Sequence, residues 1–211
     1  MTNTKQVYLI HPVKNITDAE KEYLDNYVYE KEKKGILYHY PIRDVVQDDP
    51  TGGLRICCDH RRAAEEVERA EIYFSSKSNG SMFDAGMIVY ENKPIEIINP
   101  KILKSLEGFT LDFFKNYSLH QYTGSESFDK IMEKRREIKN SGVINCRFDK
   151  TPQGYLELGM IFMSKKPIIL ENIKEVIPPT DRDKSYEKVF LRLDGQSREI
   201  LAKCQGFPCL L

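Results

Sequence analysis

The strongest constraint on the fold of this chain is a motif that occurs twice, at a fixed separation of 73 positions. In residues 79–94, Asp84 and a glycine two positions later lie in an apolar helix that is followed by Lys-Pro. In residues 153–168, Glu157 takes the position of Asp84, and Lys-Pro follows again. Each copy comes after an amphipathic helix and a β-rich run. This recurrence indicates a partial internal duplication, although helices packing on one sheet can also converge on similar residues.

Asp84 is the first candidate for a functional residue, and we expect it in the first turn of its helix. A carboxylate in that position is stabilised by the backbone N–H groups of the helix N-terminus. It would also face the crevice where open α/β sheets bind ligands. The alternative role is to start the helix, and the motif alone does not decide between the two.

Strand-like apolar runs alternate with amphipathic helices through the first hundred residues. This alternation predicts an α/β fold with a Rossmann-like (flavodoxin-like) parallel sheet flanked by helices. The partly duplicated C-terminal half follows in the same sheet or domain. The predicted strands are 6–10, 36–40, 71–75, 94–98, 143–148 and 167–170. Helices are predicted after the N-cap Thr17, from Leu54, after Asn79, over 127–139 and in the Glu157 segment. Residues 102–119 are predicted to be mostly helical, and residues 41–53 are predicted to form a polar loop.

We divide the chain into three parts on this basis. Residues 1–100 form the α/β core, residues 101–175 repeat the strand, acid-bearing helix and strand, and residues 176–211 form a C-terminal extension.

Composition excludes several classes of partner. Lys plus Arg and Asp plus Glu both number 32, so charge gives no support for general binding to nucleic acid or to a membrane surface. The N-terminus lacks a signal-peptide pattern, and no apolar stretch is long enough to cross a bilayer. The five cysteines match no zinc spacing. We therefore expect a cytoplasmic protein with reduced thiols and no metal or other cofactor.

Short motifs in a particular order carry a family resemblance. They are Val7-Tyr-Leu-Ile-His-Pro12, Pro41-x-Arg-Asp44 with Gln47 and Asp48, the run 70–74, Gly80-Ser-x-Phe-Asp-x-Gly86 and Lys93-Pro94. This order resembles the nucleoside 2-deoxyribosyltransferase-like superfamily, which includes deoxynucleoside-monophosphate N-glycosidases. The resemblance covers about the first hundred residues. It implies a Rossmann-like sheet, a homo-oligomer, and cleavage of the bond between base and deoxyribose.

The resemblance also implies roles for single residues. In that family a Glu attacks the anomeric carbon and a Tyr on the first strand supports it, which places Asp84 as nucleophile and Tyr8 as its support. Asp is one methylene shorter than Glu, and a misplacement of about 1 Å can cost roughly a hundredfold in rate. The further residues implied or suggested to border the substrate are His11, Arg43, Asp44, Asp48, Asn79, Gly80 and Ser81.

Glu157 keeps the acid that the family prefers, and its segment also resembles the monophosphate N-glycosidase motif. Its copy has no equivalent of the strand that carries Tyr8 or of the loop that carries Arg43. The Asp84 copy thus has the surrounding motifs of the family, and the Glu157 copy has the glutamate that the family uses. We favour the Asp84 crevice, and both acids stay candidates.

The expected chemistry is double displacement, in which a carboxylate forms a glycosyl-enzyme intermediate that water or a second base resolves. Asp44, Asp48 or Asp59 could protonate the leaving base. The alternative roles are solvated loop acids, a surface ion pair for Arg43 and a core position for Tyr8. The alternative functions are a nucleotide-binding module without turnover, an NAD-glycohydrolase-like enzyme, and a structural paralogue.

Overall fold

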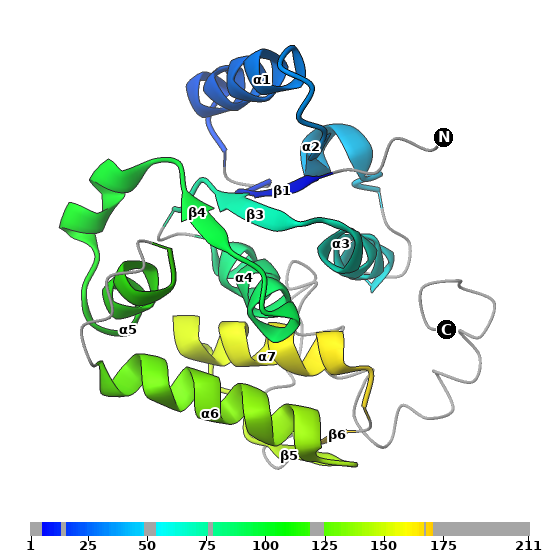
Figure 1. Cartoon of the computed structure of the whole chain (residues 1–211), viewed down its shortest axis with the longest axis vertical. Helices are drawn as coiled ribbons and strands as arrows, with labels where there is room; N and C mark the ends of the chain where they lie inside the picture. Colours follow the sequence, from blue (N-terminus) through cyan, green and yellow to red (C-terminus); the bar gives the residue numbers. More distant parts are fainter. Residues whose placement is uncertain are drawn as a thin grey trace.

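The main sheet consists of four parallel strands in the order β2-β1-β3-β4 (Figure 1). These are β1 (Val7–Ile10), β2 (Tyr38–His39), β3 (Arg69–Ile72) and β4 (Ile95–Ile97). The computed structural model describes residues 6–13, 16–48, 54–75, 78–118, 125–166 and 168–170. The predicted α/β fold with a parallel sheet flanked by helices is confirmed.

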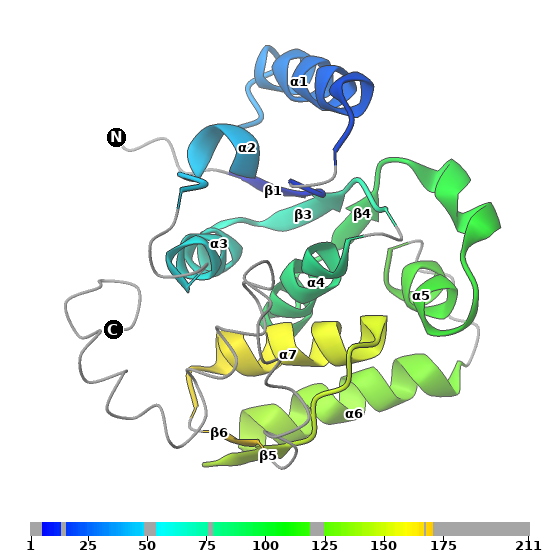
Figure 2. The same ribbon diagram turned by 180° about the vertical axis from the view of Figure 1, so that it is seen from behind.

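Helices cover both faces of this sheet. Helices α1 (Asp18–Glu32) and α2 (Pro41–Asp44) lie on one face, and α3 (Leu54–Glu66) and α4 (Asn79–Glu91) lie on the other (Figures 1 and 2). All four residues of β1 are fully buried, and their side chains alternate between the two faces. Val7 and Leu9 pack into the cluster under α1, whereas Tyr8 and Ile10 belong to the cluster that includes α4. This alternation turns Tyr8 toward the helix that carries Asp84.

The N-terminus of α1 follows the predicted pattern. Thr17 is the N-cap, its hydroxyl accepts from the backbone N–H of Glu20, and the Glu20 side chain accepts from the backbone N–H of Thr17 in return. This capping box satisfies two helix-end donors. Beyond the helix, Gly35 adopts a φ of 86°, which a residue without Cβ reaches at little cost.

The second half adds helices and a separate two-stranded sheet. Strands β5 and β6 pair in parallel with each other (Figure 2). The described residues of 102–119 are mostly helical, as predicted, and they are divided between 3₁₀, α and π segments. The elements of this half are η1 (Pro100–Ser105), α5 (Gly108–Phe113), η2 (Phe114–Ser118), α6 (Glu126–Asn140), β5 (Ile144–Cys146), α7 (Pro152–Ser164) and β6 (Ile168–Leu170).

Helices α4 and α7 are in very close contact, through two glycines. A Cβ at Gly86 would overlap the carbonyl group of Leu156, and a Cβ at Gly159 would overlap that of Phe83. The contact is reciprocal, since both Gly86 and Gly159 and both Phe83 and Leu156 differ by 73 positions. The glycines of the repeated motif therefore permit the close packing of α4 on α7.

The ends of the two motif helices also match. Ser78 and Thr151 are N-caps whose side chains accept from a backbone N–H three residues on, and Asn92 and Lys165 are left-handed C-caps. The two Lys-Pro lysines make equivalent contacts as well. Lys93 Nζ donates to the Ala64 and Glu65 carbonyls at the end of α3, and Lys166 Nζ donates to the Ile138 and Lys139 carbonyls at the end of α6.

Two local predictions are corrected. Helix α4 begins at Asn79, so Asp84 lies in its second turn and not in the first. Residues 41–44 form the single turn α2 within the predicted polar loop. Pro41 suits the first helical position, and Asp44 Oδ2 accepts from the backbone N–H of Tyr40 at 2.8 Å.

Some predictions fall outside the described residues. These include the C-terminal extension 176–211 and the two cysteines Cys204 and Cys209. The other three cysteines are buried and outside any disulfide. None of the helices in the described ranges has both the length and the apolar character needed to span a bilayer.

Candidate functional site

A cluster of aromatic and imidazole rings lies between the sheet and helix α3. Tyr8 on β1 is 5.1 Å from His39 on β2 and 5.7 Å from His60 on α3, measured between ring centroids. The His39 and His60 rings are 6.1 Å apart. All three side chains are buried. Two strands and one helix thus place one phenol and two imidazoles together beneath the protein surface.

Asp84 completes this cluster from α4. Its side chain is 3% exposed, and its Oδ1 lies 3.2 Å from Nδ1 of His60. An ionised carboxylate can only accept hydrogen bonds, so Nδ1 of His60 carries the proton that joins the pair. Among the described residues, Nε2 of His60 is fully buried and has no hydrogen-bond partner. The contact therefore orients the imidazole and leaves Nε2 for another group.

His11 borders the same cluster from the end of β1. Its Nδ1 lies 2.9 Å from the Pro12 carbonyl oxygen. Burial lowers the pKa of His11 to about 4, and the charge of His60 lowers it further, against the Pro12 carbonyl and the Asp84 and Asp25 carboxylates, which raise it. His11 is therefore neutral at pH 7. Its Nε2, like that of His60, has no hydrogen-bond partner within the described ranges.

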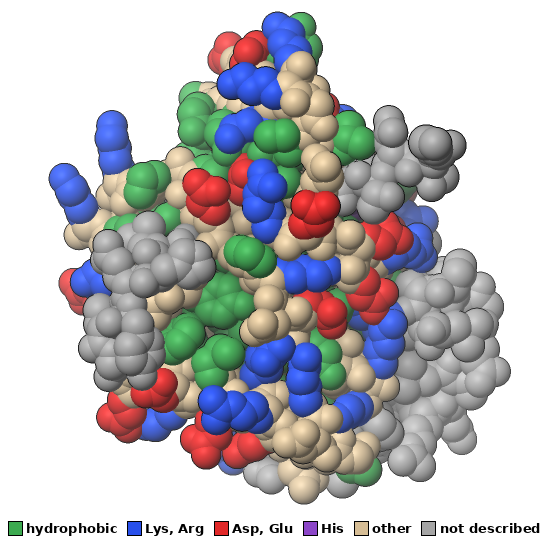
Figure 3. Space-filling view, viewed as in Figure 1, with side chains coloured by type: hydrophobic (Ala, Val, Ile, Leu, Met, Phe, Trp, Pro, Cys, Tyr) green, Lys and Arg blue, Asp and Glu red, His purple; other side chains and the backbone are tan. Residues whose placement is uncertain are grey.

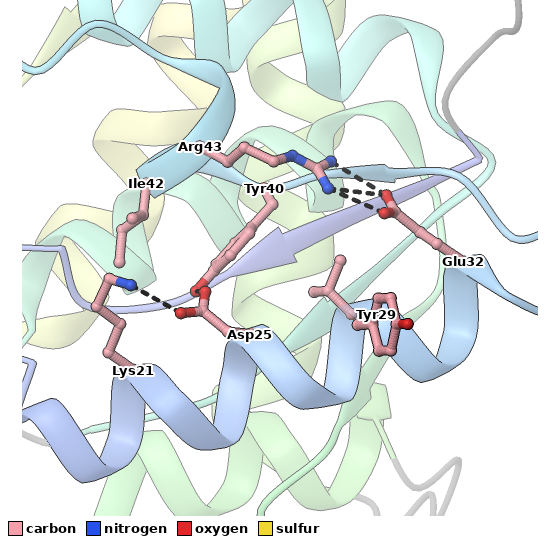
Figure 4. Close-up of a pocket in the computed structure, with 8 residues that line it drawn as sticks. Lys21, Asp25, Tyr29, Glu32, Tyr40, Ile42 and Arg43 are labelled. Carbon is pink, nitrogen blue, oxygen red and sulfur yellow. Dashed lines mark hydrogen bonds and ion pairs between the residues drawn. The ribbon is translucent and has the colours of Figure 1, made fainter.

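A cavity of about 360 Å³ lies on the other side of the sheet, between α1 and α2 (Figure 4). Tyr40 lines this cavity, and its ring centroid is 5.1 Å from that of His11. The Tyr40 hydroxyl donates to Asp25, which also pairs with Lys21. The polar groups of this cavity are joined to one another rather than left for a ligand.

Arg43 also lines this cavity, and its guanidinium is engaged. It donates to Glu32, to Asp44 and to the Tyr38 carbonyl oxygen. The arrangement matches the ion-pair alternative for Arg43. Asp44 belongs to the same network and, like Arg43, to α2, which lies on the opposite face of the sheet from α4 (Figure 1).

The remaining candidates lie in three places. Asp48 is exposed, and its backbone carbonyl accepts from Arg55. Asn79, Gly80 and Ser81 form the first turn of α4, one turn before Asp84. Glu157 is half-buried on α7 and accepts from Gln153 at 2.8 Å. In the described part of the chain, Glu157 has no aromatic and imidazole cluster like that around Asp84.

Sequence reasoning missed His39 and His60. The signal for His60 is its spacing, since Cys57, His60 and Ala64 fall on one face of α3 and all three are buried. A histidine on an otherwise apolar stripe needs a polar partner in the core, and Asp84 supplies it. His39 ends a two-residue strand and carries no comparable pattern.

Metal binding and bulk electrostatics give no further site. The described residues contain no group of three or more His, Cys, Asp or Glu side chains placed to hold a metal ion. Lys, Arg, Asp and Glu side chains are interspersed over the face seen in Figure 3.

Comparison with family models, with curated proteins and with solved structures yields no match to this chain.

Proposed function

We propose that the protein acts on the N-glycosidic bond of a nucleoside or nucleotide, with Asp84 as the acid of its site. The observation that carries the proposal is the Asp84–His60 pair, packed against Tyr8 and His39. Asp84 lies in the second turn of α4, the helix that follows β3, and open parallel sheets bind ligands beyond the carboxyl ends of their strands. The order of motifs that resembles the nucleoside 2-deoxyribosyltransferase-like superfamily adds support.

The chemistry assigns one step to each member of the pair. An Asp84 oxygen bonds to the anomeric carbon as the carbon–nitrogen bond breaks, and the leaving base takes its electron pair with it. A protonated His60 donates the Nε2 proton to that base. Water then attacks the glycosyl-enzyme intermediate and gives a proton to the neutral His60, which restores the starting state. Tyr8 packs against His60 and helps to hold its ring.

Burial of Asp84 favours one second candidate, a nucleotide-binding module without turnover. A nucleophile must come within about 3–3.5 Å of the carbon that it attacks, and Asp84 is 3% exposed. A buried Asp–His pair can still recognise sugar hydroxyls through Nε2 of His60. An NAD-glycohydrolase-like activity is covered by the same substrate test, because NAD contains the same kind of bond.

We also propose that residues 101–175 arose as a partial copy of the core. The matched caps, the two lysine contacts and the reciprocal glycine contact support this. In the copy, Glu157 pairs with Gln153, so a structural role suits it best. A cytoplasmic location and assembly as a homo-oligomer also stay predictions.

A product assay tests the proposed function. The purified protein is incubated with deoxynucleosides, their monophosphates and NAD, and released base is measured by chromatography. We expect base release by the wild type and a loss of at least about a hundredfold in Asp84→Asn. Asp18→Asn is the matched control, since Asp18 is exposed in the first turn of α1, on the other face of the sheet from α4 (Figure 1).

Each other outcome has a clear meaning. Loss in Glu157→Gln with full activity in Asp84→Asn would move the site to α7. No base from any substrate, together with a nucleotide that raises the melting temperature of the wild type, would replace the enzyme by the binding module.

A further inference from the structure

Arg61 is a buried cation with an unusual environment. It follows His60 on α3, is 5% exposed, and its guanidinium carbon lies 4.9 Å from the ring centroid of Phe162 on α7. The ring offers its π face to the cation. The Phe162 ring does not accept hydrogen bonds from the N–H groups in the plane of the guanidinium. Within the described residues, Arg61 makes no hydrogen bond or ion pair.

Among the described residues, the other buried charges have partners. Glu71 accepts from Tyr27 and Tyr38 and pairs with Arg69, while Asp84 pairs with His60. A buried charge without a counterion is costly, so Arg61 stands out among them.

Nearby acids on the same helix do not neutralise Arg61. Glu65, one turn further along α3, pairs at 2.6 Å with Lys165. Asp59 lies 3.9 Å from Arg62 instead. The Arg61 nitrogens have no partner among the described residues, yet they are not among the atoms that are completely buried without one. The small exposed area of the side chain therefore includes these nitrogens. The donors of Arg61 are thus both unsatisfied and reachable.

The position of Arg61 connects it to the Asp84 cluster. The Phe162 ring beneath the guanidinium is 5.6 Å from the Phe83 ring, and Phe83 precedes Asp84. His60 and Arg61 are consecutive on α3. In the proposed arrangement, a ligand with its sugar at the Asp84–His60 pair extends toward Arg61.

We infer that Arg61 binds the phosphoryl group of the ligand, which makes the substrate class a nucleotide rather than a nucleoside. The inference rests on the proposed function for the position of the sugar. A guanidinium presents two parallel N–H donors that match a phosphoryl group. The anion would supply the counterion that the protein does not, while the Phe162 ring supports the guanidinium from one face.

Thermal unfolding with inorganic phosphate tests this inference without any turnover. Phosphate is compared with sodium chloride at equal ionic strength, so that general screening cancels. We expect phosphate to raise the melting temperature of the wild type by roughly 3 °C at ten times its dissociation constant. The rise should vanish in Arg61→Met and persist in Arg62→Met, where the neighbouring and more exposed arginine is removed.

The outcomes separate this inference from the proposed function. No phosphate-specific rise in the wild type, or an equal rise in Arg61→Met, would overturn it even if base is released from nucleosides. Arg61→Lys keeps the positive charge but lacks the two parallel N–H donors of the guanidinium. Phosphate should raise the melting temperature of this variant by less than that of the wild type, and the variant serves as a second test if Arg61→Met does not fold. A phosphate effect that depends on Arg61 would stand even if no base is ever released.

Discussion

At the scale of single residues, the apolar core contains a group of buried titratable side chains. His11, His39, His60 and Asp84 are all buried within one region of the molecule. Asp84 and His60 share one hydrogen bond, through Oδ1 and Nδ1, and Nε2 of His60 has no partner among the described residues. His11 has a backbone carbonyl as its partner and stays neutral at pH 7, because burial lowers its pKa to about 4.

His11 should make the stability of the protein depend on pH. The unfolded chain binds a proton on this residue below its ordinary pKa of 6.5, whereas the folded state does so only below about 4. Stability is therefore lost as the pH falls from 6.5 to 4. We expect a contribution from His11 of about 2 kcal/mol between pH 7.5 and pH 5.

Urea unfolding of the wild type and of His11→Gln at the two pH values measures this contribution. The variant should lose less stability on acidification than the wild type does. Equal losses in the two proteins would show that His11 titrates alike in the folded and unfolded states.

At the scale of elements, the contact between α4 and α7 determines how the two halves fit together. The helices are in contact at Gly86 and Gly159, where carbonyl groups of the opposite helix occupy the space that a Cβ would take. Both helices are almost entirely buried over their central turns. Any side chain at either glycine would push the helices apart and open the core between them.

Gly86→Ala should therefore destabilise the protein strongly. The added methyl group meets the backbone of Leu156, which cannot rotate away as a flexible side chain could. We expect a loss of roughly 3 kcal/mol in the free energy of unfolding, measured by urea denaturation. Gly142→Ala is the control, because a Cβ there has no atom within 4 Å. Similar stabilities for the two variants would contradict the close packing of α4 on α7.

Much of this fold can be predicted from hydrophobic pattern and capping residues. The Thr17–Glu20 capping box, the strand Val7–Ile10 and the two repeated helices follow from local sequence. Local sequence does not predict how short β2 is, or that residues 100–118 are divided into three helical types. Tertiary contacts decide both features. Periodicity also could not reveal that the glycines face each other across two helices.

At the scale of the whole molecule, the candidate site consists of residues far apart in the sequence. Motif order predicts Asp84 and Tyr8 as candidates, whereas the pairing of His60 with Asp84 depends on how α3 and α4 pack in the fold. The pairing joins residues 24 positions apart, on helices separated by strand β3. The second half packs α7 against α4 and supplies Phe162 beneath Arg61, so it contributes to the surroundings of the site.

A double-mutant cycle on Asp84 and His60 tests most directly whether the pair works as one unit. The rate of base release is measured for the wild type, Asp84→Asn, His60→Gln and the double variant. If the two residues act together, each single variant should lose at least about a hundredfold, and the double variant should lose hardly more. Losses that multiply in the double variant, or a His60→Gln protein as active as the wild type, would contradict a joint role for Asp84 and His60.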